Sequence, residues 1–321
     1  MRILLTGAAG FIGFHTAKAL LARGDEVVGV DNLNDYYPVK LKEARLAQLE
    51  PSDKFTFVRT DISDRDAFLD RFKSEKFDAI IHLAAQAGVR YSIEHPFDYA
   101  DANLVGHLAI LELARAQKDL RHQVYASSSS VYGGNTKLPF SEDDAVDKPV
   151  SLYAATKRSC ELMSHTYSHL YGIPQTGLRF FTVYGPWGRP DMAYWTFTRD
   201  ILEGKPIRVF NNGDMSRDFT YIDDIVTGVL AVLDEPPQND NLHRLYNIGN
   251  NNPEKLTDFI ALIEKLTGRA AEKIMEPMQP GDVYSTYADI TAIKRDFGFE
   301  PSTPLSDGLP KFVDWFRAYN G

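Results

Sequence analysis

Short apolar runs alternate with amphipathic segments along the first 180 or so residues of the chain. The first run, residues 2–6 (RILLT), is apolar without alternation, which is typical of a strand buried on both faces. Similar runs cover residues 26–30, 55–60, 78–83, 123–127 and 175–180. Helical patterns lie between them, at residues 14–22, 39–49, 64–72, 103–117 and 153–171. This alternation predicts an α/β fold built on a doubly wound parallel sheet.

The pattern changes from about residue 182. Pro, Gly and Asn become frequent, the expected strands are short (207–210 and 246–248), and helices are predicted at 254–266 and 305–318. We expect residues 1–181 to form a nucleotide-binding domain, to which later segments at about 211–250 contribute. We expect residues 182–321 to form mainly a smaller, mixed α/β lobe that closes over a substrate.

Composition limits the possible partners. The 321 residues include 35 basic and 44 acidic side chains, a net charge of −9 that argues against nucleic acid or an anionic membrane as partner. No stretch approaches the roughly 20 apolar residues of a membrane span. The N-terminus enters a strand directly without the regions of a signal peptide, so a cytoplasmic protein is expected. The single cysteine excludes an intrachain disulfide, and no pair among the 8 histidines shows metal-ligand spacing together with an acid. His165 and His169 are four residues apart on one expected helix, where surface or dimer packing is favoured over a zinc site.

A glycine-rich segment follows the first strand at once, with the sequence GAAGFIG at residues 7–13. Strand, glycine-rich turn and helix in this order are typical of a Rossmann dinucleotide site, where pyrophosphate meets the free N–H groups of a helix N-terminus. The second strand ends at Asp31, whose carboxylate can bind both hydroxyls of the adenosine ribose. It would repel a 2′-phosphate, so NAD is expected rather than NADP.

Tyr153 and Lys157 are the candidate catalytic pair. Residues four apart share one face of a helix, and an ammonium beside a phenol favours the phenolate. A phenolate can accept a proton from a sugar hydroxyl while hydride leaves the same carbon. A buried tyrosine and a solvated lysine are the simpler alternative. The serine run at 127–130 that precedes them favours the catalytic interpretation.

Together with Asp61-Ile62, Leu83-Ala84-Ala85 and Val131-Tyr132-Gly133, these motifs resemble the extended short-chain dehydrogenases/reductases that act on nucleotide sugars. The resemblance spans nearly the whole chain and implies NAD as cofactor and a UDP-sugar as substrate. It places the pyrophosphate on Gly7, Gly10, Phe11, Ile12 and Gly13, the adenosine ribose on Asp31 and Asn32, and the adenine on Asp61 and Ile62. It places Leu83, Ala84 and Ala85 on the path to the nicotinamide, and Tyr153 and Lys157 at the nicotinamide end, with Lys157 on its ribose.

Three positions favour one branch of this family, the UDP-glucuronate 4-epimerases. The triplet Ser128-Ser129-Ser130 has no acid where the related decarboxylases and dehydratases carry one before Val-Tyr-Gly. Thr182 stands where galactose epimerases typically have Asn. Arg189 can bind a sugar carboxylate bidentately, and a neutral hexose would leave it unpaired. We therefore expect reversible C4 epimerisation of UDP-glucuronate to UDP-galacturonate through a 4-keto intermediate, with Ser128, Tyr153 and Lys157 as catalytic residues.

The resemblance adds further substrate contacts. It places Arg217 and Asp282 at the diphosphate and the uridine ribose, and Arg208 in the loop that receives uracil. Arg90 either reaches the substrate or pairs with a nearby acid, and Arg189 could instead belong to an ion pair at the surface or at an interface. The predicted substrate-binding set is Arg90, Ser128, Ser129, Ser130, Thr182, Arg189, Arg208, Arg217 and Asp282.

Alternative functions remain open at this point. They are a UDP-galactose 4-epimerase, a UDP-glucuronate decarboxylase, a dehydrogenase that releases NADH, or a non-catalytic NAD-binding regulatory protein. The family commonly forms homodimers through the two helices expected here at 103–117 and 153–171, so a homodimer is expected.

Overall fold

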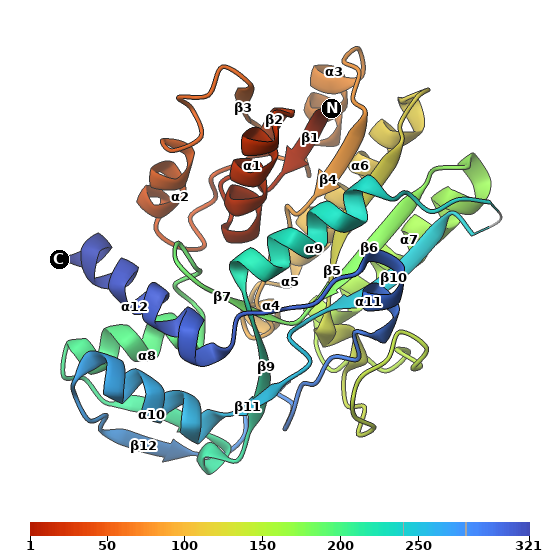
Figure 1. The fold of residues 1–321 in the computed structure, drawn as a ribbon. Helices are drawn as coiled ribbons and strands as arrows, with labels where there is room; N and C mark the ends of the chain where they lie inside the picture. Colours follow the sequence, from red (N-terminus) through yellow and green to blue (C-terminus); the bar gives the residue numbers. More distant parts are fainter. Residues whose placement is uncertain (240, 280) are drawn as a thin grey trace.

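A seven-stranded sheet forms the centre of the computed structural model, which describes residues 1–239, 241–279 and 281–321 (Figure 1). The strand order is β10-β6-β5-β4-β1-β2-β3, and every neighbouring pair runs parallel. The strands are β1 (Arg2–Thr6), β2 (Glu26–Asp31), β3 (Phe55–Arg59), β4 (Ala79–His82), β5 (His122–Ser128), β6 (Gln175–Phe180) and β10 (His243–Ile248). The chain reverses its direction of winding between β1 and β4, so the predicted doubly wound α/β fold is confirmed.

Helices cover both faces of this sheet. One face carries α1 (Phe11–Arg23), α2 (Val39–Leu46) and α9 (Ile222–Asp234), and the other carries α3 (Arg65–Phe72), α6 (Gly106–Ala116) and α7 (Leu152–Tyr171). Because successive strand residues point to opposite faces, β1 contributes to two separate cores. Ile3 and Leu5 pack with α1 and α9, whereas Leu4 packs with α3 and α6. Burial on both faces explains why β1 shows no polar alternation.

The chain leaves the large sheet after Phe180 and enters a smaller one at Thr182. This second sheet has the order β11-β9-β7, and a third sheet pairs β12 with β8. The strands of these two sheets are β7 (Thr182–Tyr184), β8 (Ile207–Phe210), β9 (Ser216–Tyr221), β11 (Pro253–Lys255) and β12 (Lys273–Glu276). The helices of this part are α8 (Ala193–Leu202), α10 (Leu256–Thr267), α11 (Thr291–Phe297) and α12 (Leu305–Asn320). The domain boundary after residue 181 stays a prediction, and β10 returns residues 243–248 to the edge of the large sheet.

The segment before α6 differs from the single helix expected at 103–117. Two short helices, α4 (Tyr91–Glu94) and α5 (Pro96–Tyr99), lead into a π-helical segment, η1 (Ala100–Val105). The buried Asn103 amide accepts from the Gln86 main-chain nitrogen at 2.9 Å and donates to the Gln86 carbonyl at 3.0 Å. π-helical turns commonly occur at functional sites, and this one anchors the loop that follows β4.

None of the helices in the described part of the chain is long and apolar enough to span a bilayer.

Candidate active site

The glycine-rich turn between β1 and α1 is shaped by close packing of its main chain. Gly7 has a φ of +75°, and a Cβ there would lie 2.8 Å from the Ala84 nitrogen. A Cβ at Gly13 would lie 2.0 Å from the Gly7 carbonyl oxygen, so only glycine fits at this position. Helix α1 begins at Phe11, with Gly10 as its N-cap residue. Because the first N–H groups of a helix favour an anion, this turn fits the pyrophosphate of a dinucleotide.

Acidic side chains are fixed at the ends of the neighbouring strands β2 and β3. Asp31 accepts hydrogen bonds from the main-chain nitrogens of Ala9 (3.2 Å) and Leu33 (2.9 Å). Asn32 donates to Asp61 at 2.8 Å, and Ser63 donates its hydroxyl to the same carboxylate at 2.7 Å. Burial raises the pKa of Asp61, but these hydrogen bonds outweigh it and hold the pKa below its ordinary value. The arrangement suits an adenosine ribose and its base.

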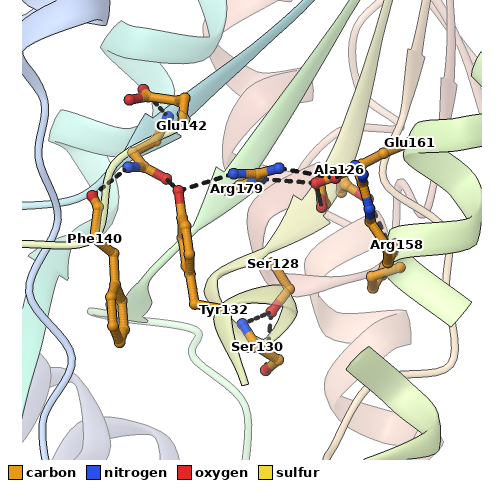
Figure 2. A network of polar contacts seen from close by, with 12 residues as sticks. Ala126, Ser128, Ser130, Tyr132, Phe140, Glu142, Arg158, Glu161 and Arg179 are labelled. Carbon is orange, nitrogen blue, oxygen red and sulfur yellow. Dashed lines mark hydrogen bonds and ion pairs between the residues drawn. The ribbon is translucent and has the colours of Figure 1, made fainter. Parts of the chain in front are cut away.

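The predicted catalytic residues come from α7 and from the end of β5. Tyr153 lies in the first turn of α7, and its ring packs edge-on against Tyr99 with 6.0 Å between ring centroids. The Lys157 Nζ donates to the Ala126 carbonyl of β5 at 2.9 Å. Ser128 ends β5, and its Oγ accepts from the Ser130 nitrogen at 3.2 Å (Figure 2).

A buried ion pair and its neighbours fix α7 against β5 and β6 (Figure 2). Glu161 lies one turn beyond Lys157 and forms two hydrogen bonds with Arg179 of β6, at 2.8 and 3.0 Å. The Ser127 hydroxyl of β5 donates to Glu161 at 2.6 Å, and Arg158 pairs with it at 3.0 Å. Burial raises the pKa of Glu161, but Arg179 outweighs it and the pKa is lowered. Glu161 therefore connects α7 to β5 through Ser127 and to β6 through Arg179.

The same network continues towards β10. Arg179 donates to the Tyr132 hydroxyl at 3.0 Å, and Tyr132 donates to the Asn247 amide oxygen at 2.6 Å. Asn247 in turn donates its amide to the Phe140 carbonyl (2.8 Å) and its main-chain N–H to Glu142 (2.7 Å). Tyr132 belongs to the Val-Tyr-Gly motif, so the motif links α7, through Arg179, to the edge strand β10 (Figure 2).

Arg189 is already paired in the protein, which corrects one expectation from the sequence. Its Nε and Nη2 atoms lie 3.0 and 2.5 Å from the two carboxylate oxygens of Asp191. Tyr36 donates its hydroxyl to the same carboxylate at 3.0 Å. A neutral sugar would therefore not leave Arg189 unpaired, because the carboxylate of Asp191, two residues further along the chain, already pairs with its guanidinium. Burial raises the pKa of Asp191, but the Arg189 charge outweighs it and the pKa is lowered.

A second group of charges lines the same pocket. Arg90 pairs with Asp282 at 3.2 Å, and its guanidinium lies 4.8 Å from the centroid of the Phe210 ring. Arg217 lies 4.0 Å from Asp282. Arg208 contacts the same ring at 5.2 Å and forms an ion pair with Glu276. Arg90 thus lines the pocket and pairs with an acid, and whether it also reaches the substrate stays a prediction.

One pocket of about 860 Å³ contains all the predicted site residues. It is lined by Gly7, Gly10, Phe11, Ile12, Gly13, Asp31, Asn32, Asp61, Ile62, Leu83, Ala84, Ala85, Arg90, Ser128, Ser129, Ser130, Tyr153, Lys157, Thr182, Arg189, Arg208, Arg217 and Asp282. Their individual roles stay predictions. Within the described residues there is no group of three or more His, Cys, Asp or Glu side chains that could hold a metal ion.

Sequence reasoning missed several residues that shape this pocket. Tyr36, Asp191 and Phe210 line it, and Asn103 holds the loop on which Gln86 lies. The pair Tyr36-Tyr37, just beyond Asp31, was the available signal, since adjacent aromatic residues in a polar loop need a surface to pack against. For Asn103 the sequence gives no comparable signal.

Comparisons with known proteins show that this chain is similar to epimerases. The family model described as NAD dependent epimerase/dehydratase matches residues 3–249. UDP-glucuronate 4-epimerase 2 of Arabidopsis thaliana is 49% identical over 99% of this chain and 76% of its own. The probable UDP-glucuronate 4-epimerase of Rhizobium meliloti (strain 1021) is 47% identical over 98% of this chain and 97% of its own length. Among solved structures, the UDP-glucuronic acid 4-epimerase of Bacillus cereus, in complex with UDP-glucuronic acid and NAD, superposes with a TM-score of 0.91 at 37% identity. It covers 99% of this chain and 100% of that one.

Proposed function

The chain belongs to the NAD-dependent epimerase/dehydratase family, and from this premise we propose that it interconverts UDP-glucuronate and UDP-galacturonate by epimerisation at C4. One observation carries the proposal. A single pocket joins a dinucleotide turn to a Ser-Tyr-Lys group, an acid-free serine triplet and an arginine at the sugar end. The proposal is supported by relatives named as UDP-glucuronate 4-epimerases, whose similarity extends over nearly the whole chain.

NAD is the cofactor that the pocket fits. The glycine turn excludes any Cβ at Gly7 and Gly13, which leaves the main chain open to a pyrophosphate, and Asp31 disfavours a 2′-phosphate. Bound NAD would accept a hydride from C4 of the sugar and return it to the opposite face, so no net redox change would result. Lys157, which donates to the Ala126 carbonyl and lines the same pocket, would hold the nicotinamide ribose.

The chain's own residues move the proton and hold the sugar. Tyr153 takes the proton of the C4 hydroxyl, Ser128 hydrogen-bonds to the same oxygen, and the Lys157 charge stabilises the phenolate. The 4-keto sugar then turns about its bond to the diphosphate. Arg217, near Asp282, anchors the nucleotide while the sugar turns.

The acid sugar creates a hazard once C4 is oxidised. A ketone at C4 and a carboxylate on C5 form a β-keto acid, which loses CO₂ when the breaking bond aligns with the carbonyl π-system. We propose that Ser129, Ser130, Thr182 and Arg189 hold the carboxylate out of this alignment. An added barrier of about 1.4 kcal/mol would already suppress the side reaction about tenfold.

The test of this function is incubation of the purified protein with UDP-glucuronate and no added cofactor, with products followed by NMR. Accumulation of UDP-galacturonate without a stoichiometric rise in reduced-nicotinamide absorbance is expected. Parallel reactions with UDP-glucose and UDP-xylose cover the other activities of the family. A preference for UDP-glucose, or a pentose as the main product from UDP-glucuronate, would overturn the proposal.

Replacing Arg189 with alanine should lower kcat/KM for UDP-glucuronate by about 10- to 100-fold. A charge-assisted hydrogen bond to a carboxylate contributes about 1.5–3 kcal/mol, and Asp191 would lose its partner as well. Release of CO₂ should rise relative to epimerisation, and Thr182→Val should act in the same direction more weakly. Steady-state kinetics and the NMR product ratio measure both effects. Arg295→Ala, which removes an exposed arginine paired with Asp296, is the control. Unchanged turnover by both site variants would remove the carboxylate assignment.

We also propose a homodimer formed through α6 and α7. Both helices expose large apolar side chains, among them Leu108 on α6 and Leu162 (52% exposed) and Leu170 (60%) on α7. A two-fold contact between copies of this face would bury them. A cytoplasmic location stays a prediction.

The variant Leu162→Arg should convert the dimer to a monomer, because the new charge would be buried in the proposed interface without a partner. Sedimentation velocity at several concentrations measures the mass. Ile274→Arg, at an apolar residue of β12 with comparable exposure (45%), should leave the mass unchanged. A monomeric unmodified protein, or a dimer that survives Leu162→Arg, would contradict the proposed face.

A further inference from the structure

Arg45 of α2 is fully buried, with 0% of its surface exposed, yet it lies outside the set of residues that line the pocket. We propose that Arg45 is a positioning residue that holds Arg189 in place and thereby sets the enzyme's preference for an acid sugar. This inference rests on the proposed function, because it concerns the same end of the same pocket. As a positioning residue, Arg45 itself touches neither cofactor nor substrate.

The contacts of Arg45 join three separate segments. Its Nε and Nη2 atoms donate to the Trp187 carbonyl at 3.1 and 2.7 Å, and Nη2 also donates to the Gly188 carbonyl at 3.0 Å. Its Nη1 atom donates to the Ala9 carbonyl and to the Tyr37 hydroxyl, both at 2.8 Å. The five N–H groups of a guanidinium form a fixed planar fork, so these five bonds determine where the acceptors lie relative to one another.

The loop that these carbonyls belong to leads directly to Arg189. Trp187 has a φ of +62°, a left-handed conformation that is strained for a large side chain. Tyr194 supports the other side of the loop, since its hydroxyl accepts from the Arg189 nitrogen at 2.9 Å. A Cβ at Gly188 would lie 2.3 Å from this hydroxyl, so the loop is packed tightly on both sides. Arg45 supplies the hydrogen bonds that hold Trp187 in its strained conformation.

The segment around Arg45 contacts both ends of the loop. Tyr36, at the start of this segment, donates to Asp191, and Asp191 pairs with Arg189. The Ala9 carbonyl belongs to the glycine-rich turn of the dinucleotide site. Arg45 and Tyr36 therefore tie the position of the Arg189 guanidinium to the turn that holds the cofactor. A displacement of about 1 Å at a positioned group can cost about 100-fold in rate, so this coupling has a functional consequence.

Other side chains cannot replace Arg45 in this role. A lysine keeps the charge but has one ammonium, which cannot reach carbonyls in two segments and a phenol at the same time. Methionine keeps much of the aliphatic length and leaves the Trp187, Gly188 and Ala9 carbonyls without their donor. We therefore expect both Arg45→Met and Arg45→Lys to loosen the loop, and Arg45→Met to have the larger effect.

The test compares two ligands that differ only at C6 of the sugar. Dissociation constants for UDP-glucuronate and UDP-glucose are measured by isothermal titration in a Tyr153→Phe background, where turnover is slowed by at least about 100-fold. Arg45→Met should raise the dissociation constant for UDP-glucuronate about tenfold and that for UDP-glucose less than about twofold. With Tyr153 intact, the same variant should release more CO₂ per epimerisation. A purely structural role would weaken both ligands equally.

A double variant tests whether Arg45 acts through Arg189. Arg45→Met combined with Arg189→Ala should bind UDP-glucuronate no more weakly than Arg189→Ala alone, because the positioned group is already absent. Arg2→Met is the matched control. It removes an arginine that makes three hydrogen bonds and stacks on Phe77, and β1 begins at this residue, far from the pocket. Tyr37→Phe removes one acceptor of Arg45 and keeps the test possible if Arg45→Met does not fold.

The outcomes separate this inference from the proposed function. If the Tyr153→Phe protein does not prefer UDP-glucuronate over UDP-glucose, the proposed function fails. If it does, and the Arg45 and Tyr37 variants keep that preference, only the role of Arg45 fails. Bound NAD per subunit is measured in each variant. Loss of NAD with an unchanged ligand preference would assign Arg45 to the cofactor turn alone and overturn the inference.

Discussion

Replacing Tyr153 with phenylalanine should lower the turnover of UDP-glucuronate by about 100- to 10,000-fold while NAD stays bound. A positioned general base contributes about this much to a rate, and phenylalanine removes only the hydroxyl that exchanges the proton. The ring contact with Tyr99 is retained, so the first turn of α7 should keep its place. The measurements are kcat with saturating UDP-glucuronate and the NAD released from the protein on denaturation.

Tyr167→Phe is the matched control for this prediction. It removes a phenol hydroxyl from the same helix, where Tyr167 donates to Glu112 at 2.5 Å, and it lies outside the pocket. Its turnover should stay within about twofold of the unmodified protein. A Tyr153→Phe protein that turns over at near-normal rates would show that Tyr153 does not exchange the proton.

Replacing Arg179 with methionine should destabilise the protein by about 3–5 kcal/mol. The change leaves Glu161 buried and without its main partner, and an uncompensated buried charge costs about this much. It also removes the donor that Tyr132 accepts from. The free energy of unfolding, from reversible denaturation in urea, measures the effect. Arg158 still contacts Glu161, which places the expected value towards the lower end of the range.

The pH dependence of this variant has a defined sign. In the unmodified protein the pKa of Glu161 is lowered, so its contribution to stability is present at neutral pH and is lost as the pH falls through the folded-state pKa. In Arg179→Met, burial without the cation raises the pKa, so the folded state takes up a proton as the pH falls. The difference in unfolding free energy should therefore shrink between neutral pH and about pH 5.

The double variant Glu161→Gln/Arg179→Met separates charge from packing. With both charges absent, the loss of stability should be smaller than for Arg179→Met alone, because no buried charge is left uncompensated. A double variant as unstable as the sum of the two single changes would show that packing of Arg179, rather than its charge, accounts for the effect.

Local rules made the cofactor end of the site predictable. The glycine-rich turn, the strand before it and the helix after it lie within about twenty residues, and backbone sterics at Gly7 and Gly13 dictate their residue types. The Tyr153–Lys157 pair also follows from helical spacing alone. These features could be read from the sequence because each one depends on residues that are neighbours in the chain.

The buried charged residues that hold the rest of the site in place were not predictable in the same way. Arg45 meets Trp187 across 142 positions of sequence, and no local pattern distinguishes it from an exposed arginine on an amphipathic helix. Arg179 and Glu161 likewise look like ordinary charged residues until β6 and α7 are packed together. The pairing of Arg189 with Asp191 was within reach, since the two charges stand two residues apart, and the expectation of an unpaired arginine overlooked it.

The position of β10 also bears on how the protein is made. This edge strand comes from residues 243–248, whereas its neighbour β6 ends at Phe180. During translation, more than sixty residues beyond β6 must leave the ribosome before β10 can pair with it. Until then the free edge of β6 can pair incorrectly with another chain, so the nascent protein is prone to aggregation during this stage of its synthesis.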